Sequence, residues 1–73
     1  MSDSPQAVSV RINGEDREIA APCSIAGLLD SLRVSRTHTA VERNRQIVPK
    51  SDFERVMLED GDVLEIVTLV GGG

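Results

Sequence analysis

DGDVLEIVTLVGGG, at residues 60–73, contains a turn, an apolar run and three consecutive glycines. The triplet Asp60-Gly61-Asp62 is typical of a turn. Residues 63–70 are nearly all apolar, and a run of this kind predicts a central β-strand buried on both faces. Glycine lacks a Cβ atom, so the backbone of residues 71–73 can enter a narrow slot. The segment therefore predicts a buried strand that leads into an unhindered chain end.

The first part of the chain predicts a hairpin and a helix that can pack beside this strand. Residues 8–12 alternate apolar and polar side chains, which is the period of a strand covered on one face. Asn13-Gly14 favours a tight type I′ turn, so the following segment should return antiparallel to the first strand. Ser24 is the predicted N-cap of a helix whose apolar residues recur at helical spacing. Gly27 lies inside this helix, where either close packing on a sheet or simple sequence drift would explain it, and we favour close packing.

The middle of the chain predicts shorter elements. Residues 40–44 are typical of a short strand that ends in turn-forming residues, and residues 47–49 of another, whose extension Pro49 blocks. Residues 50–58 are irregular, with one helical turn expected near Phe53. The element order is therefore strand, strand, helix, two minor strands and a final strand.

This order predicts an α+β fold of the β-grasp, or ubiquitin-like, type. A mixed sheet of four to five strands would wrap around one main helix, with the last strand parallel to the first and beside it through a crossover connection. We expect a flexible polar lead over residues 1–7, the β-grasp domain over residues 8–70 and a flexible reactive tail over residues 71–73. Four extended residues after Leu69 would reach about 14 Å. The carboxyl end could thus enter the active site of another protein.

Composition argues against several functional classes. The chain has 73 residues, a formal net charge of -4 and a single aromatic residue, so nucleic-acid binding is disfavoured. No apolar run approaches a membrane span, and residues 1–7 lack the features of a signal peptide, so we expect a cytoplasmic protein that does not bind membranes. Cys23 is the only cysteine, and we interpret it as a partly buried filler rather than a reactive thiol. His38 has no neighbours that would complete a metal site or a catalytic constellation.

The remaining candidate for chemistry is the terminal carboxylate of Gly73. A carboxylate is ionised at neutral pH and is a poor electrophile, so it needs activation. An enzyme that uses ATP could convert it to an acyl-adenylate, and a sulfur nucleophile such as a persulfide could then displace AMP. The product would be a thiocarboxylate, in which the chain end carries sulfur. We predict that this chain is not itself an enzyme.

Several short motifs support this interpretation by their order and spacing. They are Val41-Glu42-Arg43-Asn44, Ile47-Val48-Pro49, Asp60-Gly61-Asp62, Leu64-Glu65-Ile66-Val67 and Val70-Gly71-Gly72-Gly73. With them, the chain closely resembles the ThiS-type sulfur carriers of bacterial thiamine biosynthesis, from about Val8 to the end. The resemblance implies a β-grasp fold and a carrier that binds no cofactor stably, because ATP is used by the activating partner.

The resemblance also implies roles for the glycines and a set of partners. Gly73 would be adenylated by a ThiF-type, E1-like enzyme and then thiocarboxylated with sulfur derived from cysteine through a persulfide donor. Gly71 and Gly72 would thread the slot that leads to the active site. The thiocarboxylate would deliver its sulfur to the thiazole synthase, ThiG, where the thiazole ring is built.

Two alternatives stay open. One is a sulfur carrier of another pathway, such as the small subunit of molybdopterin synthase, although residues 67–70 lack the aromatic and proline-rich approach to the glycines of that group. The other is a ubiquitin-like protein modifier or a plain interaction module, for which Lys50 would be the one site of self-conjugation.

The residues next to the glycines are the candidates for docking on a partner. They are Leu69, Val70 and the outward side of the final strand. Acidic residues lie close to the final strand, and they either form a solvated face or steer the tail into a basic groove of a partner. They are Glu59, Asp60, Asp62 and Glu65.

Overall fold

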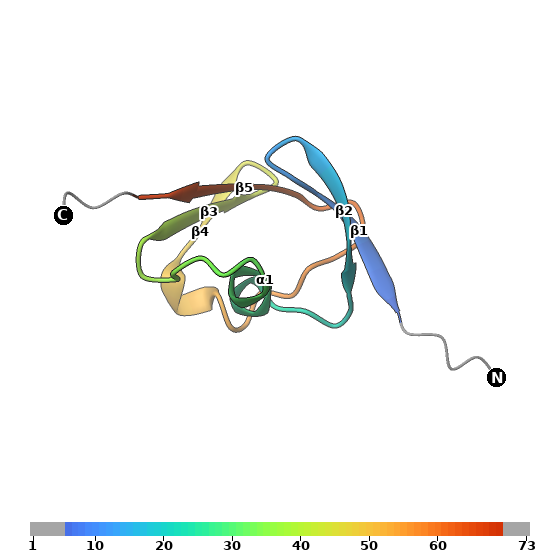
Figure 1. Cartoon of the computed structure of the whole chain (residues 1–73), viewed down its shortest axis with the longest axis horizontal. Coiled ribbons are helices and arrows are strands. Elements are labelled where there is room, and N and C mark those ends of the chain that lie inside the picture. Colours follow the sequence, from blue (N-terminus) through green and yellow to red (C-terminus); the bar gives the residue numbers. More distant parts are fainter. Residues whose placement is uncertain (1–5, 70–73) are drawn as a thin grey trace.

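The final strand of the chain lies in the middle of the sheet. The computed structural model describes residues 6–69. Its elements, in chain order, are β1 (Ala7–Ile12), β2 (Glu15–Ala20), α1 (Ile25–Ser31), β3 (Thr39–Arg43), β4 (Gln46–Val48), the 3-10 turn η1 (Lys50–Asp52) and β5 (Val63–Thr68). The five strands are ordered β2-β1-β5-β3-β4, and α1 lies on one side of the curved sheet (Figure 1). Strand β5 is parallel to β1 and antiparallel to β3, so the predicted β-grasp arrangement is confirmed.

The β1–β2 hairpin forms as the sequence predicts. Asn13 and Gly14 both have positive φ, 51° and 86°, which is the requirement of a type I′ turn. The register runs from the Ala7–Ala20 pair to the Ile12–Glu15 pair that closes the turn. The two-residue connection therefore fixes which side chains of both strands face the helix.

Helix α1 begins and packs for clear local reasons. The Ser24 side chain is the N-cap and accepts a hydrogen bond of 3.0 Å from the Gly27 N–H. The helix presents an apolar face to the sheet, formed by Ile25, Ala26, Leu28 and Leu29. The prediction that Gly27 packs closely on the sheet is wrong, because a Cβ atom there would meet only the Cys23 and Ser24 side chains of the same helix start.

The core lies between α1 and the inner face of the sheet. It consists of Val10, Ile12, Ile25, Ala26, Leu28, Leu29, Val41, Val48, Phe53, Leu58 and Leu64. The prediction that β5 is buried on both faces is wrong. Leu64 is fully buried, whereas Val63 and Val67 on the same strand are 47% and 55% exposed. The described chain has one helix, and this helix covers one side of the sheet, so the apolar residues on the other side of β5 stay in contact with solvent.

Candidate functional site at the end of strand β5

Strand β5 is paired on both sides at its start and on the β3 side as far as its last residue. Two parallel pairs join it to β1, and five antiparallel pairs join it to β3, the last of them between Thr39 and Thr68. Beyond the strand, the Leu69 N–H donates a hydrogen bond of 2.6 Å to the His38 carbonyl. Thr39 is fully buried, and its hydroxyl donates to the Ser35 carbonyl. The direction of the chain is therefore set by a braced sheet as far as Leu69.

Asn13 braces β5 where β1 ends. Its side-chain oxygen accepts a hydrogen bond of 2.9 Å from the Ile66 N–H, and its side-chain nitrogen donates one of 3.1 Å to the Ile66 carbonyl. One amide side chain thus satisfies both backbone groups of Ile66 that face the vacated edge. From the sequence, Asn13 was predicted only as a turn residue. The bond to Ile66 could not be predicted, because the two residues are more than fifty positions apart in the chain.

A polar network fixes the start of β5. Asp62 is 4% exposed and accepts hydrogen bonds from the Glu59 N–H at 2.8 Å, from Arg43 at 2.9 Å and from Asn44 at 3.2 Å. Asn44 in turn accepts a bond from the Val63 N–H at 2.9 Å. Burial alone would raise the pKa of Asp62, but these hydrogen bonds and the positive charge of Arg43 outweigh it and hold the pKa below its usual value.

The acidic residues near β5 therefore do not form one solvated face. Asp62 is a buried structural carboxylate, and Asp60 accepts a hydrogen bond of 2.6 Å from the Ser9 N–H. The Oε1 atom of Glu59 lies 3.7 Å from Nη2 of Arg43, and the same arginine pairs with Asp62. Glu65 is the member of the set that lies on β5 itself, and it is exposed.

The predicted docking and tail residues fall partly within the described chain. Leu69 is 51% exposed, and with Val63 and Val67 it lies on the side of β5 that faces away from the helix. Ile47 of β4 is also exposed. The other predicted site residues, Val70, Gly71, Gly72 and Gly73, lie outside the described residues.

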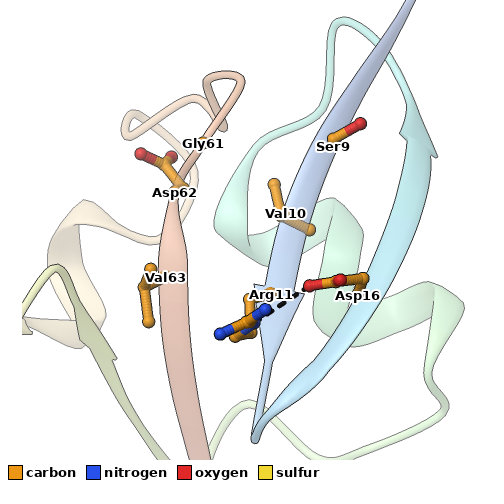
Figure 2. Close-up of a pocket in the computed structure, with 7 residues that line it drawn as sticks. All are labelled: Ser9, Val10, Arg11, Asp16, Gly61, Asp62 and Val63. Carbon is orange, nitrogen blue, oxygen red and sulfur yellow. Dashed lines mark hydrogen bonds and ion pairs between the residues drawn. The ribbon is translucent and has the colours of Figure 1, made fainter.

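A cavity of about 380 Å³ lies between β1 and the start of β5. Figure 2 shows the Arg11 side chain turned toward Asp16 at its edge, where the two groups form an ion pair of 2.9 Å. This pairing lowers the pKa of the Asp16 carboxyl. Asp62, the other carboxylate of the lining, is already held by Arg43 and Asn44. The cavity thus offers paired charges rather than an activated acid or base.

The structure also bears on Cys23 and on the possibility of a metal site. Cys23 is partly buried, its Sγ donates to the Ser24 carbonyl at 3.3 Å, and burial raises the pKa of its thiol, so the interpretation as a filler is favoured. Residues 6–69 contain no cluster of three side chains that could hold a metal ion. In the same range, no helix is long and apolar enough to cross a membrane.

The comparison with protein families is decisive. The sequence model of the ThiS family matches residues 10–73, which run from the second half of β1 through β5 to the three glycines. The chain belongs to the ThiS family.

Individual relatives agree with this assignment. The chain is 38% identical over 65 residues to the sulfur carrier protein ThiS of Bacillus subtilis, covering 88% of this chain and 98% of that protein. It superposes on the crystal structure of a thiamine biosynthesis protein, ThiS, from Geobacter metallireducens with a TM-score of 0.76 and 26% identity, covering 90% of this chain and all of that one. These matches confirm the ThiS-type resemblance that the motifs of the sequence indicate.

A third relative is much longer. A thiazole synthase of Paramagnetospirillum magneticum is 50% identical over 62 residues, which are 85% of this chain and 19% of that protein. The ThiS-family chain therefore spans about a fifth of the length of this relative.

Proposed function

We propose that this chain is the sulfur carrier of thiazole synthesis in thiamine production, and that Gly73 carries the sulfur. The observation that carries the proposal is the family match, which spans residues 10–73 and so includes Gly73. The braced end of β5 supports it, because a fixed strand restricts the positions from which the following residues can start. The chain acts here as a co-substrate of other enzymes rather than as an enzyme.

The first step is activation by a ThiF-type, E1-like enzyme. The Gly73 carboxylate attacks the α-phosphorus of ATP, pyrophosphate leaves, and a mixed anhydride with AMP forms. The anhydride replaces a poor electrophile with one that has a good leaving group. The activating enzyme supplies the ATP site, so the carrier needs no stably bound cofactor.

The second step loads the sulfur. The outer sulfur of a cysteine-derived persulfide attacks the acyl carbon and AMP leaves, which gives an acyl disulfide. A thiol then attacks the cysteine sulfur of the donor protein, the S–S bond breaks, and the Gly73 thiocarboxylate leaves, while the thiol and that cysteine form a new disulfide. In both steps the acyl group of Gly73 must reach an enzyme active site. Gly71 and Gly72 have no side chains, so they cause the least steric hindrance there.

The thiocarboxylate then passes its sulfur to a ThiG-type thiazole synthase. Support for this partner comes from the relative named thiazole synthase, a fifth of which matches this chain. The carrier of molybdopterin synthesis remains the alternative, and the receiving enzyme distinguishes the two. A purified thiocarboxylated chain should supply sulfur to thiazole synthase and not to the large subunit of molybdopterin synthase.

An intact-mass experiment tests the carrier function. The protein is incubated with ATP, a ThiF-type enzyme of the same organism and a persulfide donor with a thiol reductant. Replacement of one oxygen by sulfur, located at Gly73 by fragmentation, is the expected result. An unchanged mass, with an enzyme preparation that loads the Bacillus subtilis ThiS protein in a parallel reaction, would contradict the proposal.

A further inference from the structure

Strand β5 runs past the end of β1. The last register pair between these two strands joins Ile12 to Leu64, whereas β3 pairs with β5 as far as Thr68. In the described structure, residues 65–68 therefore have a neighbouring strand on one edge alone. Two-stranded ribbons twist more strongly than strands inside a sheet. A contact on the free edge is thus needed to fix the direction of this end of β5.

Asn13 makes that contact. Alternate residues of a strand turn their N–H and C=O groups to the same edge, and Leu64 and Ile66 turn theirs toward β1. The Leu64 carbonyl accepts a hydrogen bond of 3.0 Å from the Asn13 N–H, and the Asn13 side chain bonds to both backbone groups of Ile66. Because hydrogen bonds are directional, two of them fix the orientation of Ile66 as well as its position. Asn13 therefore takes the place of one further residue pair between β1 and β5.

The turn does not by itself require this amide side chain. Asn13 needs positive φ, and glycine or aspartate would meet that requirement too. Past Asn13, the edge of β5 borders a cavity of about 300 Å³ whose lining includes Leu32, Ile66 and Thr68. Thr68 is the next residue that faces this edge, and no hydrogen bond joins its backbone to a described residue there. Within residues 6–69, Ile66 is thus the last point at which β5 is held on the β1 side.

We propose that Asn13 is a positioning residue for adenylation, because it sets the direction in which β5 delivers Gly73 to the activating enzyme. This inference rests on the proposed carrier function. Leu69 follows Ile66 by three positions, which is about 10 Å along an extended chain. A change of about 10° in the twist at Ile66 would therefore shift Leu69 by ~2 Å. Misplacement of reacting groups by ~1 Å can cost a hundredfold in rate, although three glycines can compensate for part of it.

Two substitutions at Asn13 test this role in the full chain. Asn13→Gly keeps a residue that tolerates positive φ and removes both side-chain bonds to Ile66. Asn13→Asp is nearly isosteric and also tolerates positive φ, but above about pH 7 its ionised carboxylate cannot donate to the Ile66 carbonyl. Adenylate formation is measured in a single turnover with ATP, a ThiF-type enzyme and increasing concentrations of carrier. Both variants should slow the saturated rate on the order of tenfold, while the carrier concentration at half saturation stays within about twofold.

Ser24→Ala is the matched control. It removes the N-cap hydrogen bond of 3.0 Å from the Gly27 N–H, so it acts on α1 and not on β5. Loss of a cap and loss of side-chain hydrogen bonds lower the stability of a fold by similar amounts. The control should nevertheless form the adenylate at the wild-type rate. A role of Asn13 in stability alone would give all three variants the same rate.

Residual dipolar couplings of the isolated carrier report the direction of its amide bonds without any enzyme. Relative to β1, the Thr68 and Leu69 amides should change direction in both Asn13 variants and keep it in Ser24→Ala. The hydrogen bond from Leu69 to the His38 carbonyl should remain, because β3 and β5 stay paired and move together. Unchanged amide directions in the Asn13 variants would contradict the proposal.

The outcomes separate this inference from the carrier function. If the wild type is adenylated at Gly73 but both Asn13 variants react as Ser24→Ala does, the positioning role is wrong and the carrier function stands. A wild-type rate for Asn13→Asp would equally contradict the positioning role, because the paired bonds to Ile66 would then not be required. If the wild type is not adenylated by an enzyme preparation that loads another ThiS protein, both proposals are wrong.

Discussion

At the residue scale, Gly27 should be replaceable by alanine with a gain in stability. A Cβ atom there would lie 3.4 Å from Cys23 Sγ and 3.5 Å from Ser24 Oγ, which are ordinary contact distances. The hydrogen bond from its N–H to Ser24 would remain. Because glycine is less favourable than alanine in a helix, Gly27→Ala should raise the free energy of unfolding by about 0.5–1 kcal/mol. Urea unfolding measures this change.

Gly61 provides the matched control for that prediction. An added Cβ would meet nothing within 4 Å, yet its φ of 89° is a conformation that alanine rarely adopts. Gly61→Ala should therefore lower the free energy of unfolding. A gain at Gly61, or a loss at Gly27, would show that backbone conformation does not decide the effect.

Asp62 should make the fold sensitive to acid. Its pKa in the folded protein is held below the ordinary value of 3.8, against the effect of burial, by the Glu59 N–H, Arg43 and Asn44. Its contribution to stability is therefore complete above about pH 4 and is lost as pH falls through the folded-state pKa. Asp62→Asn should lower the free energy of unfolding at pH 7 by roughly 1–3 kcal/mol and flatten its decline in acid. Urea unfolding between pH 7 and pH 2 measures both effects.

Asp16 serves as the control for the acid prediction. The pKa of this carboxyl is also lowered, by its hydrogen bond and ion pair with Arg11, but both groups are exposed to solvent. Exposed ion pairs contribute little to stability. Asp16→Asn should therefore change the unfolding curves far less than Asp62→Asn. Equal effects would show that burial of Asp62 is not what matters.

Residues with local signals were predictable from the sequence, and residues with distant partners were not. The Ser24 cap and the Asn13-Gly14 turn depend on neighbours within a few positions, and both were predicted. The buried state of Asp62 depends on Arg43 and Asn44, which are 19 and 18 positions away. Nothing in a run of acidic residues indicates which one will be covered.

At the element scale, the Asn13 side chain should control the end of β5. Asn13→Gly keeps a residue that tolerates positive φ but removes both side-chain hydrogen bonds to Ile66. A net loss of about 1 kcal/mol should result, with amide exchange at Ile66 faster by roughly fivefold. The Leu69 amide, which donates to His38 on the opposite edge of β5, should change less. Uniform acceleration at both amides would indicate global rather than local opening.

The element order was predictable, but the environment of β5 was not. Hydrophobic period and turn residues predicted all five strands and the helix, and the central position of β5 followed from the parallel crossover. The apolar run at residues 63–70 was interpreted as a strand buried on both faces. Sequence pattern cannot distinguish a strand that its own chain covers on both faces from one that keeps an exposed face. The exposure of Val67 on β5 and of Ile47 on β4 in the structure makes this distinction.

At the scale of the whole molecule, the single helix explains why one face stays open. A chain of 73 residues has enough apolar surface for one small core, and α1 uses the inner face of the sheet for it. The other side of β5 keeps exposed apolar side chains, among them Val63 and Val67.

Folding and sulfur loading should be separable in one variant that lacks Gly73. The described sheet is complete at Leu69, so deletion of Gly73 should leave the melting temperature unchanged. The carboxylate, however, is drawn back by about 3.5 Å, and misplacement by even ~1 Å can cost a hundredfold in rate. Adenylation, followed by pyrophosphate exchange, should thus fall at least a hundredfold. Normal exchange by the shortened chain would mean that Gly73 is not the residue that is activated.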